Sequence, residues 1–213
     1  MANNNQVYMP VVSVDSFHYG RVLTDTKDGI TGEVPKAVPG LVEAGYNRNA
    51  QSATFFADGG PYATAVGAGE FDGSIGVADI PAGLSSDFYG DDYNSSTGEL
   101  QLGDINSPDN FIQYRVEKST GAWRYVTIYK AKFMPNEQTA QTRGGSVNFQ
   151  TNGFSFKAAN TVFNGKAARI LDDDDPNLPE GVTPEVIAAN WFTDIYWEIA
   201  APTASEPTTP EGD

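Results

Sequence analysis

The chain has 213 residues, no cysteine and a formal net charge of −15 from 13 basic and 28 acidic residues. This length suits one domain with a proper core, and the missing cysteine excludes disulfides, thiolate nucleophiles and cysteine-based zinc sites. An acidic surface repels phosphate, so we expect no sequence-specific binding of nucleic acid. We also expect neither a signal peptide nor a membrane span, because the chain has no run of about 18 apolar residues.

The N-terminal part predicts strands separated by a loop. Residues 7–17 form a first extended segment, and residues 1–20 as a whole are expected to be an N-terminal arm or strand. Residues 24–40 are rich in Gly, Pro, Asp and Lys, which predicts a long loop that is functional or mobile. The next strands are predicted over residues 41–46 and 53–57.

Residues 52–79 carry two β-rich runs split by a Gly-Gly-Pro turn, and no group suited to covalent or metal chemistry. Between Glu70 and Val77 apolar and polar positions alternate strictly, a period of two that is typical of a half-buried strand. The expected inward face consists of Phe71, Gly73, Ile75 and Val77. The segment is therefore predicted to assemble a sheet rather than to catalyse.

A short helix is predicted over the sequence AGLSSDFYG that follows Pro81. Proline is tolerated at a helix start, and Gly90 can end the helix. Leu84, Phe88 and Tyr89 would form its buried stripe.

The clearest hairpin joins residues 111–117 to residues 122–133 through Lys118-Ser119-Thr120-Gly121. The glycine suits a turn position with positive φ. Val126 and Ile128 make the second arm apolar on both faces, as expected for a central strand that is covered on both sides.

The C-terminal part predicts one more long strand, over residues 147–157. Its apolar parity switches across Asn152-Gly153, which indicates a tight turn or, by preference, a β-bulge. Residues 158–181 are expected to be loop.

A short helix is predicted to begin at Thr183-Pro184-Glu185, which supplies a capping hydroxyl, a proline at the first position and an acid in the first turn. An extended aromatic piece is expected over residues 191–199. Residues 200–213 predict a disordered acidic tail, because they cannot bury enough apolar surface to fold.

Patterns that indicate chemistry are mostly missing. His18 is the only histidine, so it cannot build a multi-histidine metal site, and nothing near it suggests a catalytic triad. The run Asp172 to Asp175 lacks the ligand alternation of an EF-hand and predicts a solvated acidic loop. The sequence GAGEFD at residues 67–72 has Asp72 where a dinucleotide fingerprint needs its third glycine. No carboxylate pair stands out, so we expect no enzyme, no catalytic or cofactor-binding residue, no cofactor and no metal.

Aromatic residues leave an alternative open. They could form a sugar-binding platform, although such residues more often fill a β-sandwich core or a subunit interface. The candidates are Trp123, Tyr125, Tyr129, Trp191 and Trp197.

Four blocks of this sequence, in the same order, resemble the major tail tube proteins of long-tailed (siphovirus-type) bacteriophages. The blocks are ATFFADGGPYATA, GEFDGSIGVADIPAGLSSDFYG, STGAWRYVTIYKAKFMPNEQTAQTRGGSVNFQTNGFSF and ANWFTDIYWEI. The resemblance implies a mainly β fold, with a β-sandwich or barrel-like core and one flanking α-helix. Residues 1–199 would form a single tail tube domain with an extended N-terminal arm and a long loop. Residues 53–62 would be the aromatic strand and turn of the family, and residues 81–89 its packing helix.

The resemblance further implies a structural virion protein without catalytic residues. Its copies would form hexameric rings that stack into the phage tail tube, the conduit for ejection of genomic DNA. Assembly would take place in the host cytoplasm, with a tape measure protein and with tail terminator and distal tail proteins as partners. The alternative is a β-sandwich carbohydrate-binding module.

Such a tube predicts roles for the arms and for the charge. The arm up to Phe17 and the loop over residues 24–40 would add strands to the sheet of a neighbour. An acidic lumen would let DNA pass without sticking, with a repulsive field that decays over about 8 Å at physiological salt. Glu70 and Asp72 are candidates for that lumen.

Overall fold

The computed structural model describes residues 9–67, 69–137 and 151–199. The expectations for residues 1–8, for residues 147–150 and for the tail over residues 200–213 lie outside the described residues. None of the helices in the described ranges is long and apolar enough to cross a membrane.

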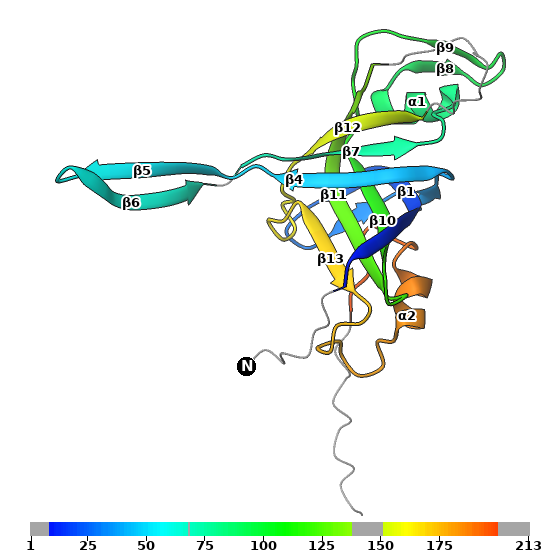
Figure 1. The fold of residues 1–213 in the computed structure, drawn as a ribbon. Coiled ribbons are helices and arrows are strands. Elements are labelled where there is room, and N and C mark those ends of the chain that lie inside the picture. The colour runs from blue at the N-terminus through cyan, green and yellow to red at the C-terminus, as the bar shows by residue number, and fades with distance from the viewer. Residues whose placement is uncertain (1–8, 68, 138–150, 200–213) are drawn as a thin grey trace, which may run out of the picture.

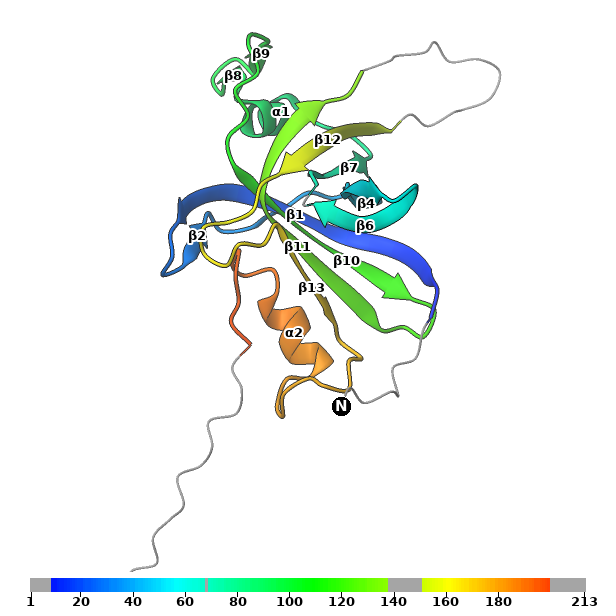
Figure 2. The same cartoon turned by 90° about the vertical axis from the view of Figure 1, so that its left-hand side faces the viewer.

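The prediction of a mainly β fold is confirmed. One nine-stranded antiparallel sheet forms the body, with the strand order β2-β1-β10-β11-β12-β7-β4; β3 also pairs with β1, and β13 with β11 (Figures 1 and 2). The sheet folds over so that β4, at one end, lies close to β1 and produces a β-sandwich-like body. The strands of this sheet are β1 (Val11–Asp25), β2 (Ile30–Gly32), β3 (Lys36–Ala37), β4 (Leu41–Arg48), β7 (Phe71–Val77), β10 (Asn110–Lys118), β11 (Trp123–Pro135), β12 (Asn152–Ala158) and β13 (Ala168–Asp172).

Two small two-stranded sheets and two helices complete the described chain. They are β5 (Gln51–Ala57) with β6 (Gly60–Gly67), β8 (Asp92–Asn94) with β9 (Glu99–Gln101), and the helices α1 (Ala82–Tyr89) and α2 (Pro184–Asn190). In Figure 1 the β5–β6 hairpin extends far from the body, while α1 and α2 lie at opposite ends of it. The two helices begin where the sequence predicts, and Gly90 ends α1 with a φ of 78°.

The first strand and the segment after it differ from the prediction of free arms. β1 runs on to Asp25 and pairs with β10 along most of its length. The expected loop over residues 24–40 contains β2 and β3, which both fold back onto β1. Ile30 and Val38 from this segment are buried in the core. Its Gly and Pro residues correctly indicate turns, but strands of two or three residues are too short to produce a periodic pattern.

The β10–β11 hairpin is confirmed as the centre of the sheet. Every residue of β11 from Tyr125 to Tyr129 is buried, so this strand is covered on both faces. Val126 and Ile128 contribute to the main core, whereas Tyr125 and Tyr129 pack into two smaller clusters on the other face. The two-sided apolar pattern therefore identified the central strand correctly.

The main core is an aromatic cluster beneath α1. Phe88 is fully buried, and its ring centroid lies 4.7–4.8 Å from those of Tyr19, Phe133 and Phe154. Such edge-on and tilted arrangements are the favourable geometries of aromatic pairs. The helix is thereby fixed against strands β1, β11 and β12.

Three other predictions need correction. β12 pairs with β7 without a register shift, so the described part of this strand carries no bulge at Asn152-Gly153. The expected loop over residues 158–181 contains β13, which continues the edge of the sheet beside β11. Residues 191–195 form turns rather than the expected extended piece.

Phe88→Ala should lower the free energy of unfolding by about 3–5 kcal/mol, because it leaves a cavity at the centre of the main core. Phe56→Ala is the matched control: Phe56 is 67% exposed, and its truncation should change the free energy by no more than about 0.5 kcal/mol. Urea unfolding of the dilute protein, followed by tryptophan fluorescence, measures both. Equal effects of the two substitutions would contradict the assignment of the core.

Candidate assembly interface at the projecting hairpin

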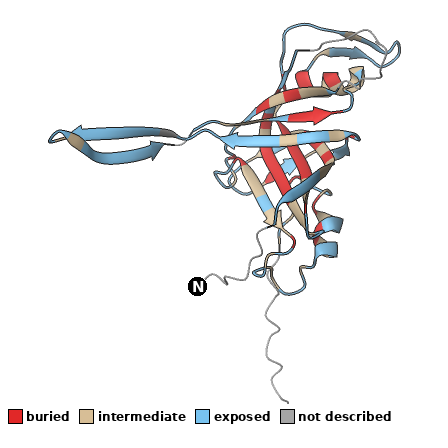
Figure 3. Ribbon diagram, viewed as in Figure 1, coloured by how far each residue is buried: buried red, intermediate tan, exposed pale blue. Residues whose placement is uncertain are grey.

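The β5–β6 hairpin is the most exposed apolar element of the described chain. Across residues 51–67 the only charged residue is Asp58. Figure 3 shows both strands exposed along nearly their whole length. The large side chains among them are Phe55, Phe56, Tyr62 and Val66, with 65%, 67%, 73% and 69% of their surface exposed.

The hairpin turn explains how the ribbon closes. Asp58 and Gly59 have φ values of 51° and 78°, and Ala57 lies opposite Gly60. Two consecutive positive φ angles define the two-residue turn that Asp-Gly favours and that matches the twist of the flanking strands. The sequence thus marks the turn correctly as glycine-rich, but its central residues are Asp58-Gly59 rather than Gly-Gly-Pro.

The two faces of the hairpin carry different side chains. One face combines Phe55 with Ala63, and the rings of Phe55 and Tyr62 meet edge-on at 6.3 Å. On the other face Thr54 lies opposite Thr64, with their hydroxyl oxygens 3.3 Å apart. An isolated two-stranded hairpin is at best marginally stable in water, so this ribbon needs a covering surface.

The base of the hairpin continues the β4–β7 pair, and contacts at this base fix the direction in which the hairpin leaves the body. The Asn49 backbone N–H donates to the Glu70 carbonyl at 2.9 Å, and the Asn49 amide donates to the Asp72 carboxylate. Gly69 crosses so close to the other leg that a Cβ there would lie 0.8 Å from the Asn49 carbonyl oxygen. Only glycine allows this close approach of two backbones.

A cavity of about 650 Å³, here called the base groove, lies where the ribbon diverges from β13. Tyr46 and Phe71 form one wall and stack with ring centroids 5.4 Å apart. Ala168 and Ile170 of β13 also line it. The groove is comparable in size to sites that bind compact apolar groups.

The sequence candidates for chemistry have structural roles instead. His18 is half-buried and stacks on Phe192 at 4.5 Å. The predicted solvated acidic run is wrong: Asp173 is 7% exposed and accepts the Trp123 backbone N–H at 2.8 Å. Within the described ranges no group of three or more His, Cys, Asp or Glu side chains could hold a metal ion.

Ion pairs hold Asp172 and the exposed Asp174, whereas Asp175 accepts hydrogen bonds from the backbone and side chain of Asn177. The buried Lys118 ammonium lies 3.2 Å from Asp172 and also pairs with Asp174. A hydrogen bond from Arg124 at 2.6 Å is the main cause that lowers the pKa of Asp172, while burial raises the pKa of Asp173. These contacts fasten the end of β13 to the central hairpin.

The aromatic residues considered for sugar binding do not form an exposed platform. Tyr125, Tyr129 and Trp191 are 1–2% exposed and belong to the core clusters around β11. Trp123 and Trp197 are half-buried against the same cluster as Trp191. The most exposed aromatic residues of the described chain, Phe55, Phe56 and Tyr62, belong instead to the projecting hairpin, which composition alone did not single out.

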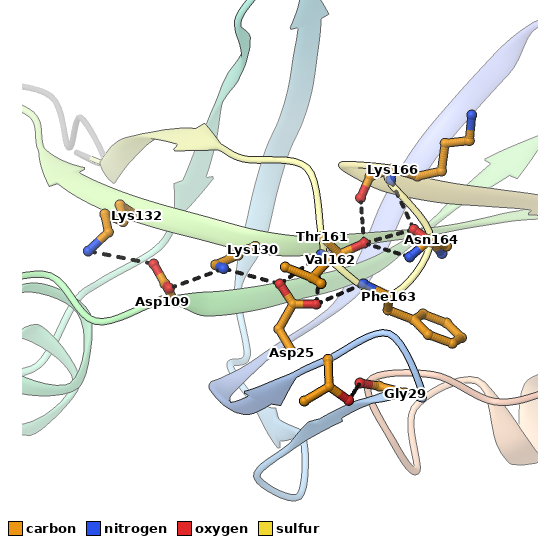
Figure 4. A network of polar contacts seen from close by, with 11 residues as sticks. Asp25, Gly29, Asp109, Lys130, Lys132, Thr161, Val162, Phe163, Asn164 and Lys166 are labelled. Atoms are coloured by element: carbon orange, nitrogen blue, oxygen red, sulfur yellow. Dashed lines mark hydrogen bonds and ion pairs between the residues drawn. The ribbon is translucent and has the colours of Figure 1, made fainter.

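A polar network around Asp25 joins the end of β1 to the loop after β12 (Figure 4). The Asp25 carboxylate accepts the backbone N–H groups of Val162 and Phe163 at 2.9–3.1 Å and pairs with the Lys130 ammonium at 3.1 Å. Burial by itself would raise the pKa of Asp25, but these donors outweigh it and lower the pKa below its ordinary value of 3.8. The network is a structural clamp, because the donors saturate the carboxylate.

Asp25→Asn should destabilise the fold by about 1–3 kcal/mol near neutral pH, because the N–H groups lose a charged acceptor. A carboxyl whose folded-state pKa is lowered stabilises the fold at pH values above the ordinary 3.8. That contribution is lost as pH falls through the lowered pKa, so the gap between parent and variant should close in acid. Thermal unfolding across pH measures this, with the exposed Asp28→Asn as control; a gap that stays constant in acid would contradict the clamp.

Gly69→Ala should re-aim the hairpin without unfolding the body, because the added Cβ collides with the backbone of Asn49. Gly45→Ala is the matched control, since a Cβ at Gly45 meets no atom within 4 Å. Limited chymotrypsin digestion after Phe55, Phe56 or Tyr62 should be several times faster for Gly69→Ala than for the control. Identical digestion of the two variants would show that Gly69 does not hold the base.

Comparisons with protein-family models and with curated proteins find no match for this chain. Among solved structures, the chain is similar to the cryo-EM structure of the anti-feeding prophage cap, described as a tube terminating cap. The similarity covers 80% of this chain and 96% of the cap, at 11% sequence identity and a TM-score of 0.43. A likeness of this strength identifies neither a family nor a function.

Proposed function

We propose that the chain is a non-enzymatic structural protein of a long-tailed bacteriophage virion. Its copies join into hexameric rings, and stacked rings form the tail tube through which the genome is ejected. Two things support the proposal: the resemblance of four sequence blocks in the same order, and one structural observation. That observation is the β5–β6 hairpin, an apolar ribbon with no cover in the described chain.

The energetics of the hairpin support self-assembly. Strands of seven and eight residues give the ribbon a reach of about 23 Å beyond the body. Burial of the exposed two-thirds of Phe55, Phe56 and Val66 contributes roughly 3–6 kcal/mol before the costs of association. In a closed ring each subunit makes one hairpin contact with its neighbour, and rings repeated along the ring axis stack into a tube.

The charge of the chain supports a conduit for DNA. A net charge of −15 disfavours adhesion of a phosphate backbone to the inner wall. Of the two carboxylates predicted for the lumen, Glu70 is partly neutralised by Lys157 at 2.6 Å, whereas Asp72 keeps its charge and accepts a hydrogen bond from the neutral amide of Asn49. The proposed partners remain those that the resemblance implies: a tape measure protein and the terminator and distal tail proteins, in a tube assembled in the host cytoplasm.

The purified chain should form rings and tubes as its concentration rises, visible by negative-stain electron microscopy and by light scattering. Replacing Phe55, Phe56 and Tyr62 together by Ser should abolish assembly while the thermal unfolding temperature of the body stays unchanged, because these side chains contribute nothing to the core.

Leu102→Ser provides the matched control, since Leu102 is 78% exposed and lies outside the hairpin. It should assemble like the parent. A parent chain that stays monomeric at every concentration would overturn the proposed function. Normal tubes from the triple variant would show that the hairpin is not needed for assembly.

A further inference from the structure

The base groove borders an unpaired sheet edge. On one side, β13 pairs with β11: the Tyr129 N–H donates to the Ala167 carbonyl, and the Asp173 N–H to the Trp123 carbonyl. Backbone groups alternate between the two edges of an antiparallel strand, so those of Ala168 and Ile170 point to the opposite edge. No described strand pairs with β13 on that edge. An open edge beside a groove that holds both apolar and charged side chains is an arrangement that can accept an added strand.

The groove also carries two basic side chains that form no ion pair within the described ranges, while its one acidic lining residue, Glu70, is already paired with Lys157 at 2.6 Å. Arg48 and Lys166 line it, and neither forms an ion pair with any described residue. Most other basic side chains of this acidic chain do have a carboxylate partner within 4 Å. The hairpin has the complementary composition, because Asp58 at its turn is its only charge.

A hairpin cannot fill the groove of its own chain. Val66, at its base, lines the groove, while the turn lies at the far end of a ribbon that leads away from the body (Figure 1). The tip of another copy has no such restriction. The exposed rings of Phe55 and Tyr62 match the aromatic wall formed by Tyr46 and Phe71.

We propose that the base groove of one copy binds the tip of the β5–β6 hairpin of a second copy, which adds a strand to the free edge of β13. Phe55 and Tyr62 pack against Tyr46, Phe71 and Ile170, and Asp58 lies near Arg48 and Lys166. This docking rests on the proposed function and specifies which surfaces meet. Because each copy carries one tip and one groove, the contact is head-to-tail and can propagate around a ring.

Engineered disulfides test the docking directly, because the natural chain has no cysteine. Ala63→Cys is placed on the exposed face of the hairpin that carries Phe55, and Ile170→Cys on the groove wall. A disulfide requires the two Cα atoms to approach within about 7 Å. Mild oxidation of the assembled double variant should give a covalent ladder beyond the dimer on non-reducing gels.

The control combines Ala63→Cys with Leu102→Cys, a site away from the groove that is more exposed than Ile170, at 78% against 46%. It should give no ladder, and neither single-cysteine variant should exceed a dimer. An assembled Ala63→Cys/Ile170→Cys protein that forms no ladder would overturn the docking and leave the proposed function standing. Failure of the cysteine-free parent to assemble at all would overturn the proposed function, and the docking with it.

Charge reversal provides a second readout. Arg48→Glu with Lys166→Glu, introduced into the Ala63→Cys/Ile170→Cys protein, should reduce the ladder severalfold at low salt, because Asp58 then faces like charge. Lys27→Glu is the control, since Lys27 is exposed and outside the groove and also lacks an ion pair with any described residue. Equal losses from both changes would exclude the pairing of Asp58 with the groove.

Discussion

A two-stranded ribbon cannot cover its own faces, and this constraint governs how the protein is built. Every other large strand pair of the described chain is covered by a helix, by a further strand or by the curled sheet itself. The β4–β7 pair is embedded in the body at one end and becomes the bare β5–β6 hairpin at the other. The apolar side chains of this hairpin can therefore be buried only by contact with another molecule.

The body is rigid where the ribbon emerges. Strand β7 is paired on both sides, by β12 and by β4, so the base of the ribbon is part of the main sheet. Buried Phe154 and Phe156 of β12 pack beneath it as part of the main core. Clamps such as Asp25 with the backbone of Val162 fix the loops around the base groove. A rigid base suits a contact that must repeat with one geometry in every copy.

Much of this fold follows from local pattern. The two-sided burial of β11, the Gly90 end of α1 and the Thr183 cap of α2 come from short-range chemistry, and each is found where the sequence predicts it. Strand β7 is also present, but its burial does not alternate, because Ile75, Gly76 and Val77 are all buried. Short strands such as β2, β3 and β13 are not predicted, because two to five residues are too few to show a periodic pattern, and the partner of β13 is also distant in sequence. The same holds for the β5–β6 hairpin. The sequence shows its aromatic residues and its turn, but not that it projects from the body. Whether a strand rejoins a sheet or leaves it depends on tertiary contacts.

Gly69, at the base of the β5–β6 hairpin, controls the direction of the whole hairpin through a single backbone contact. The direction in which the hairpin leaves the body depends on one crossing of two backbones, at Gly69 and Asn49. Substitutions there could alter the pitch at which neighbouring copies meet and leave the aromatic centre around Phe88 untouched. In the proposed assembly, very few substitutions at this crossing would therefore change the geometry of the contact between copies without changing the residues that fold the body.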